Sequence, residues 1–108
     1  MAFRYRITDI DKLKDRAVFF DANVLIYLFW PNPQQTWQQK YSLIYGRLLK
    51  QKNPLVVNIS VLSDSLDFGD KIITLQCKEK QYILLTNDND FLQSDIDILS
   101  VNSKIFTY

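Results

Sequence analysis

The chain has 108 residues, of which 47% are hydrophobic and 23% charged, so it has room for one domain with a single core and an ordinary globular composition. Its formal net charge of +1 gives no general attraction to nucleic acid, and any such binding has to come from local patches. It has no histidine and a single cysteine, Cys77, which excludes an internal disulfide, a cysteine-based zinc site and histidine-dependent catalysis. Metal chemistry in this chain therefore has to be carboxylate chemistry.

The N-terminal residues are basic but lack the apolar stretch of a signal peptide, and no later run is long enough to span a membrane. We therefore expect a cytosolic protein without a membrane partner. Residues 4–16 alternate charged and isolated apolar positions, which predicts an extended or short helical lead-in (1–16) without chemistry. The whole chain, 1–108, is expected to form a single domain.

The first half of the remaining sequence predicts one strand and two helices. A buried strand is expected at 17–20, and a helix from 23 to 30 that Pro31 stops. The second helix carries an apolar stripe, most simply core, made of Trp37, Tyr41, Ile44, Tyr45 and Leu48.

The second half continues the alternation of strands and helices. The elements expected there are a strand at 55–59, a short helix at 60–66, a helix from 70 to about 80, and strands at 82–86 and 96–101. Strands that alternate with helices predict an α/β fold in which a mainly parallel sheet is covered on both faces.

Two of the predicted strands end in aspartates. Asp21 follows the strand at 17–20, and Asp88 follows the strand at 82–86. Ligands of open parallel sheets bind outside the carboxyl ends of the strands, so these acids indicate a shared pocket suited to Mg²⁺ or Mn²⁺. The alternative is that each aspartate only caps the helix after it, because aspartate is a favoured N-cap residue.

Asp70 and Asp64 are further candidates. On a helix, Asp70 shares a face with Ile73 and Cys77, which turns its carboxylate toward the sheet, where a charge is costly unless it is paired or coordinated. It could instead complement the helix dipole. Asp64 lies one helical turn after a strand and is the weaker candidate.

The second predicted helix also carries basic residues. They form either a solvated face or a patch that contacts phosphates, and they are Lys40, Arg47, Lys50 and, just past its end, Lys52.

Four motifs in series resemble a PIN domain over most of the chain. They are Phe20-Asp21-Ala22-Asn23, the run 60–64, the run 67–73, and Leu85-Thr86-Asn87-Asp88-Asn89-Asp90-Phe91. The resemblance implies a three-layer α/β/α sandwich and a metal-dependent ribonuclease, often the toxin of a toxin–antitoxin pair. The partners it implies are an RNA substrate and an antitoxin protein.

The resemblance also assigns roles to residues. It makes Asp21, Asp64, Asp70 and Asp88 the four metal-binding acids, with Asp64 standing where the family usually has glutamate. It gives supporting roles to Asn23 beside the first acid, to the Thr86 hydroxyl and to Asp90 as an accessory acid. Such carboxylates would hold one or two cations that activate a water, with Thr86 or Asn23 orienting that water or a carboxylate. Local lysines such as Lys71 and Lys78 would meet RNA phosphates.

The chain departs from the family between its second and third acids. Only five residues separate Asp64 from Asp70, so the long helical segment usual there is largely absent. The chain is then a minimal PIN-like domain, a degraded one or a deliberately shortened one. Apolar surface left without the missing helical wall favours a homodimer.

Two other functions compete with the ribonuclease. A PIN-like RNA- or protein-binding module that has lost catalysis would explain the shortened middle, although retention of four acids opposes it. A phosphotransferase of the haloacid-dehalogenase type needs a second aspartate two residues after the first, where Asn23 stands.

Overall fold

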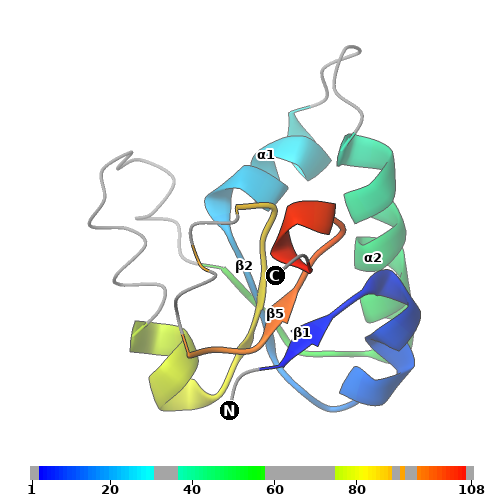
Figure 1. The fold of residues 1–108 in the computed structure, drawn as a ribbon. Coiled ribbons are helices and arrows are strands. Elements are labelled where there is room, and N and C mark those ends of the chain that lie inside the picture. Colours follow the sequence, from blue (N-terminus) through cyan, green and yellow to red (C-terminus); the bar gives the residue numbers. More distant parts are fainter. Residues whose placement is uncertain (1–2, 31–36, 58–74, 89–90, 92–94, 107–108) are drawn as a thin grey trace.

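The computed structural model describes residues 3–30, 37–57, 75–88, 91 and 95–106 (Figure 1). The strands form one five-stranded sheet in the order β1-β5-β4-β2-β3, and each pair of neighbours is parallel. The expected α/β class with a mainly parallel sheet is confirmed.

The elements follow one another along the chain much as their patterns predict. They are β1 (Arg4–Tyr5), the 3-10 helix η1 (Ile7–Leu13), β2 (Val18–Phe20), α1 (Ala22–Phe29), α2 (Trp37–Gln51), β3 (Leu55–Val57), a helical stretch at 75–80, β4 (Ile83–Leu85), β5 (Ile98–Leu99) and the 3-10 helix η3 (Ser103–Ile105). Strands β2, β4 and β5 are shorter than expected, and residues 58 and 59 of the strand expected at 55–59 lie outside the described residues. The helix expected at 60–66 and the first part of the one expected from 70 lie outside the described residues.

The N-terminal segment, expected as a lead-in, is part of the fold. Strand β1 forms an edge of the sheet beside β5, where Ile98 N–H donates to Phe3 O (3.0 Å) and Ser100 N–H to Tyr5 O (3.1 Å). The following helix η1 buries Ile10 and Leu13 completely or nearly so. A two-residue strand is too short to show the alternation by which a strand is recognised in sequence.

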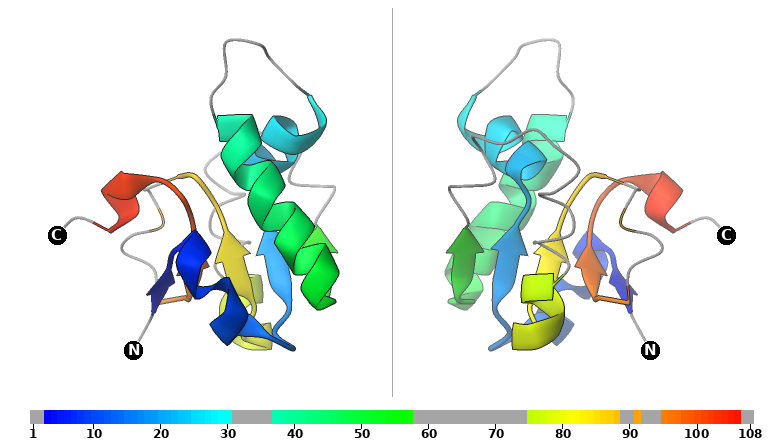
Figure 2. Two further views of the ribbon diagram at one scale, coloured as in Figure 1. Left: turned by 90° about the vertical axis from the view of Figure 1, so that its right-hand side faces the viewer. Right: turned by 90° about the vertical axis from the view of Figure 1, so that its left-hand side faces the viewer.

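Side chains of the strands alternate between two apolar cores, one on each face of the sheet. Val18 and Phe20 of β2 pack with η1, α1 and α2, whereas Phe19 packs with Cys77 of the helix at 75–80. Figure 2 shows α2 and η1 on one side of the sheet and the helix at 75–80 on the other. Near-continuous apolar strands are what a parallel sheet covered on both faces requires.

Helix α1 begins at the carboxyl end of β2, and α2 then returns toward the amino ends of the strands (Figures 1 and 2). The side chain of Asn53 fixes the turn after α2 by donating to Leu13 O (2.6 Å) and Arg16 O (2.9 Å). This end of α2 is thereby tied to the segment that leads into β2. In the part of the chain that the structure describes, no helix is both long and apolar enough to cross a bilayer.

Candidate functional site at the carboxyl edge of the sheet

The pairing of β2 with β4 brings the first candidate residues together. Phe20 is in register with Leu85, and Asp21 N–H donates to Leu85 O (3.0 Å), so Asp21 and Thr86 lie side by side where the two strands end. Asp21 is 5% exposed and Thr86 is fully buried. Ligands of parallel sheets usually bind just outside the carboxyl ends of the strands, which is where these two residues lie.

The Asp21 carboxylate is held at both of its oxygens. Oδ1 accepts a hydrogen bond from the Ala22 N–H (2.8 Å), and Oδ2 accepts one from Thr86 Oγ1 (2.7 Å). Asp21 is the N-cap of α1, so the capping role considered from the sequence is confirmed. The same bonds satisfy a nearly buried charge and fix its orientation, which a metal ligand or catalytic carboxylate also requires.

Thr86 connects Asp21 to Asp88. Its hydroxyl donates to Asp21 and accepts from the Asp88 N–H (3.0 Å), so a single oxygen joins the first and fourth predicted acids. Asp88 is half-buried. Because residues 89 and 90 lie outside the described part, the capping alternative for Asp88 stays untested.

A second polar network, which the sequence did not predict, adjoins this site. The Tyr41 hydroxyl, from α2, donates to Asn87 Oδ1 (2.7 Å) and lies 3.2 Å from Ser100 Oγ, just past β5. Asn102 extends the network by donating from Nδ2 to Asn87 O (2.7 Å). Burial raises the pKa of Tyr41 from 10 to about 12, so this phenol stays protonated and able to donate at an alkaline pH where an exposed tyrosine ionises.

Two sequence signals indicate this network. Helical spacing places Tyr41 in the apolar stripe of the second helix, and the residue is indeed fully buried, but its hydroxyl is the polar centre of the network. Ser100 directly follows β5, the kind of position at which Asp21 and Asp88 also stand. The strand expected at 96–101 extends beyond β5 and includes Ser100, so this signal is visible only once the end of the strand is known.

Of the remaining predicted site residues, the two that the structure describes do not join this hydrogen-bonded cluster. Asn23 is exposed on α1, and no hydrogen bond joins its side chain to a described residue. Lys78 is exposed on the helix at 75–80, which lies at the opposite, amino-terminal end of the strands (Figure 2). The other candidates, Asp64, Asp70, Asp90 and Lys71, lie outside the described residues.

The described residues bring two of the predicted metal-binding acids, Asp21 and Asp88, to this edge of the sheet. Asp21 and Asp88 offer carboxylate oxygens, the ligands that Mg²⁺ and Mn²⁺ prefer. Within the described ranges, no group of three or more acidic, cysteine or histidine side chains comes together to hold a metal ion. The donor chemistry fits such a cation, and two carboxylates would have to come from elsewhere in the chain to make the four-acid site.

Cys77 is not a competing catalytic centre. It is 1% exposed in the core under the opposite face of the sheet. Burial, with a smaller contribution from the negative charge of Asp21, raises the pKa of its thiol to about 12. Since the thiolate is the nucleophile, the side chain is inert near neutral pH.

The polar residues at this edge thus come from five separate parts of the chain, after β2, in α1, in α2, after β4 and after β5. In α1, the Tyr27 hydroxyl accepts a hydrogen bond from Asn87 Nδ2 (3.4 Å). The convergence of Asp21, Tyr27, Tyr41, Asn87 and Ser100 follows from a parallel sheet whose strand ends all meet at one edge. Comparison of the chain with models of protein families, with curated proteins and with solved structures gives no match.

Proposed function

We propose that this protein is a PIN-type ribonuclease that depends on a divalent cation, Mg²⁺ or Mn²⁺. The observation that carries the proposal is the Thr86 hydroxyl, which bridges the Asp21 carboxylate and the Asp88 backbone at the carboxyl edge of a parallel sheet. These are three positions that the motif resemblance assigns to the catalytic site, and they come from two motifs far apart in the sequence. Because these residues contact one another, we interpret the two motifs as parts of a single site.

The finer features of this family are part of the same proposal. Helices on both sides of the sheet support a three-layer α/β/α arrangement (Figure 2). A role as the toxin of a toxin–antitoxin pair, with an antitoxin as protein partner, rests on the motif resemblance.

Each residue of the proposed site has a separate task. Asp21 and Asp88 would hold the cation, and Asp64 and Asp70 are proposed to complete its ligands. The bound cation would lower the pKa of a water and stabilise charge on the phosphate in the transition state. Thr86 donates to Asp21 and thereby fixes the direction in which the other lone pairs of that carboxylate point. Asn23, exposed on the first turn of α1, would act on the substrate side of the site rather than by holding Asp21.

A module that binds RNA or protein without cleaving it is the second candidate. It is favoured by the shortened middle of the chain, where only five residues separate Asp64 from Asp70. It predicts RNA binding that is insensitive to Mn²⁺, which separates it from the enzyme.

The decisive experiment is cleavage of a labelled single-stranded RNA by the purified protein. The ribonuclease should cut in Mn²⁺ or Mg²⁺ and stop when EDTA is added, and Asp21→Asn should not cut. Lys80→Gln, a change on the helix at 75–80, is the control that should retain activity. A folded protein that cuts no RNA with either cation would overturn the enzyme in favour of the binding module.

Self-association is a separate part of the proposal. Helix α1 and its C-cap expose Ile26, Phe29 and Trp30, with Trp30 at 73%. Burying such surface between two copies would stabilise a dimer. Sedimentation should give a dimer at high protein concentration, and Trp30→Glu should shift it to monomer; a wild-type monomer under these conditions would refute the dimer.

A further inference from the structure

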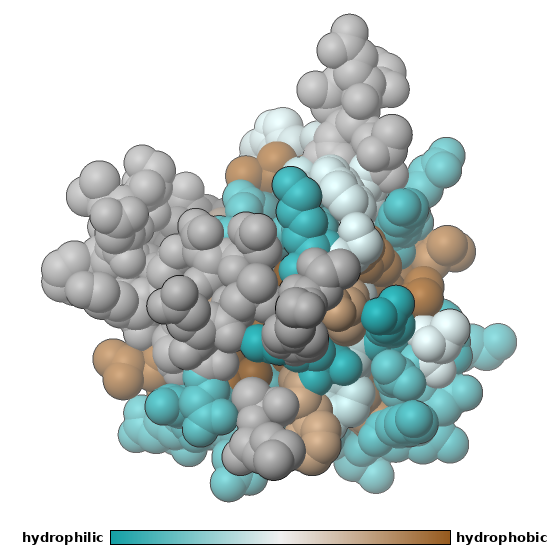
Figure 3. Space-filling view, viewed as in Figure 1, coloured by the Kyte–Doolittle hydropathy of each residue, from teal (hydrophilic) through white to brown (hydrophobic). Residues whose placement is uncertain are grey.

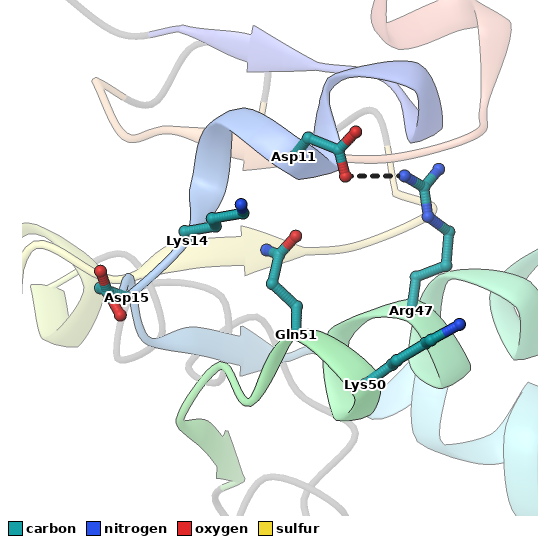
Figure 4. Close-up of a pocket in the computed structure, with 6 residues that line it drawn as sticks. All are labelled: Asp11, Lys14, Asp15, Arg47, Lys50 and Gln51. Atoms are coloured by element: carbon teal, nitrogen blue, oxygen red, sulfur yellow. Dashed lines mark hydrogen bonds and ion pairs between the residues drawn. The ribbon is translucent and has the colours of Figure 1, made fainter.

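A cleft of about 590 Å³ lies between η1 and α2, away from the carboxyl edge of the sheet. Its lining residues are Asp11, Lys14, Asp15, Arg47, Lys50 and Gln51 (Figure 4). Ligand sites of several hundred Å³ are typical of small molecules or of a short stretch of a polymer.

The walls of this cleft are held together by side chains that cross it. Arg47 donates to Asp11 Oδ1 (2.9 Å) and to Ile7 O (3.2 Å), which joins α2 to η1 (Figure 4). At the other end, Gln51 Nε2 donates to Ile10 O (3.1 Å). The cleft is therefore formed before any ligand arrives, so binding does not have to order its walls.

The charge of the cleft favours an anion. Arg47 and Asp11 neutralise one another, and neither Lys14 nor Lys50 has a hydrogen-bond or ion-pair partner among the described residues. Asp15 is the remaining acid. Hydrophilic side chains gather over this part of the surface (Figure 3).

The surroundings add to that charge. Helix α2 contains Lys40, Arg47 and Lys50 and no acidic residue, and Lys52 follows it directly. Lys50 also complements the negative end of the helix dipole, and this would account for one lysine at this end. Lys14, at the C-cap of η1, complements that helix in the same way, and it lines the cleft from the other wall, so both walls contribute a lysine (Figure 4).

Helix α2 links the cleft to the candidate active site. Tyr41 touches Asn87 at the carboxyl edge, and the helical rise of about 1.5 Å per residue puts Lys50 about 14 Å farther along the axis. About four stacked nucleotides, at roughly 3.4 Å each, cover that length. One RNA strand can therefore reach both places along a helix that carries only positive charge.

From these observations we infer that the cleft between η1 and α2, through Lys14 and Lys50, binds backbone phosphates of the RNA strand whose cleavage the carboxyl edge would carry out. The inference rests on the proposed ribonuclease function. It assigns the basic residues of α2 to phosphate contact, one of the two roles open from the sequence.

The test measures the binding of a labelled single-stranded RNA 20-mer to the full chain by fluorescence anisotropy. EDTA is present so that cleavage does not interfere. Lys14→Gln/Lys50→Gln should weaken binding about tenfold at low salt and lower the slope of log K against log salt by about 0.7 for each phosphate that the variant no longer neutralises. The control Lys12→Gln/Lys80→Gln removes the same charge, also near helix ends but outside the cleft, and should change neither quantity. Lys14→Arg/Lys50→Arg should bind like the wild type, which guards against an effect of misfolding.

Equal losses in the two glutamine pairs would overturn the inference, because the effect would then be one of net charge. The inference would also be overturned if unlabelled polyglutamate displaced the labelled RNA as effectively as unlabelled RNA does, since an acidic protein segment would then be the better ligand. In Mn²⁺, the cleft variant should raise KM for the 20-mer and leave kcat unchanged. If RNA binding depends on Lys14 and Lys50 but the protein does not cleave RNA, the proposed ribonuclease function is refuted and the cleft inference stands. If the protein cleaves RNA but its affinity for RNA does not depend on Lys14 and Lys50, only the cleft inference is refuted.

Discussion

Thr86 Oγ1 donates a 2.7 Å hydrogen bond to Asp21 Oδ2, joining two residues that are 65 positions apart in the sequence. The same oxygen accepts the N–H of Asp88, so its donor and acceptor capacities are both used inside a fully buried environment. A hydroxyl in that situation fixes the position of both neighbours. It is the group on which the candidate site depends most directly.

Replacing Thr86 by valine should therefore affect both stability and activity. Thr86→Val keeps the shape but leaves the Asp21 oxygen and the Asp88 N–H without their partner, a loss of roughly 1–3 kcal/mol in the free energy of unfolding. Thr86→Ser keeps the hydroxyl and should recover most of the loss. Urea denaturation measures the first effect and RNA cleavage in Mn²⁺ the second; a valine variant that cleaves RNA at the wild-type rate would show that the hydroxyl has no part in the reaction.

Substitutions of Asp21 should distinguish the contribution of its helix cap to stability from the role of its negative charge in catalysis. Asp21→Asn keeps an oxygen for the Ala22 N–H but places its amide N–H against the Thr86 hydroxyl, which then has to accept rather than donate. It also removes the charge of a nearly buried carboxylate, so in EDTA its melting temperature should equal or exceed that of the wild type. Asp21→Ala loses the cap and should be destabilised by about 1 kcal/mol or more. Both should abolish cleavage. If Asp21→Asn melts lower in EDTA and still cleaves RNA, Asp21 is a structural cap without a catalytic role.

Mn²⁺ should stabilise the folded protein, because a ligand that binds only the native state raises its free energy of unfolding. At a Mn²⁺ concentration 100 times the Kd, the gain is about 2.7 kcal/mol. Thermal melts with and without Mn²⁺ measure the shift, which should vanish in Asp21→Asn and persist in Lys80→Gln. An equal shift in all three proteins would place the bound cation elsewhere.

Alkaline pH should destabilise the protein through Tyr41. Its pKa is raised from 10 in the ordinary phenol to about 12 in the fold, chiefly by burial, so between these values the unfolded chain binds fewer protons than the native one. The stability that this group contributes is therefore complete below pH 10 and falls as pH rises through 12. Urea melts of the wild type from pH 9 to about 12 measure this dependence.

The matched variant for this measurement is Tyr41→Phe in a Cys77→Ala background, which removes the similarly buried thiol. It should flatten the alkaline dependence of the free energy of unfolding. It should also lower stability at neutral pH by roughly 1–3 kcal/mol, since Asn87 and Ser100 lose their shared partner. An unchanged slope would mean that this phenol ionises equally in the folded and unfolded states.

Much of the fold follows from local pattern. Val18-Phe19-Phe20 and Ile83-Leu84-Leu85 are short apolar runs, and both form strands buried on two faces. The stripe of the second helix packs as its spacing predicts, and α2 begins at Trp37. The edge strand β1 was not predictable as such, because two residues next to charged neighbours carry no periodic signal.

For the candidate site, too, one part follows from the sequence and another only from the tertiary structure. The short apolar runs that precede Asp21 and Asp88 determined that both stand at strand ends, because residues that follow a buried strand emerge at its carboxyl edge. Only the tertiary structure decided that β2 pairs with β4, that Thr86 lies between the two acids, and that Tyr41 reaches Asn87 and Ser100. Periodicity along the chain reports which side of an element is apolar, whereas the strand order and the helix orientation that bring distant polar groups together are set by the packing of the whole core.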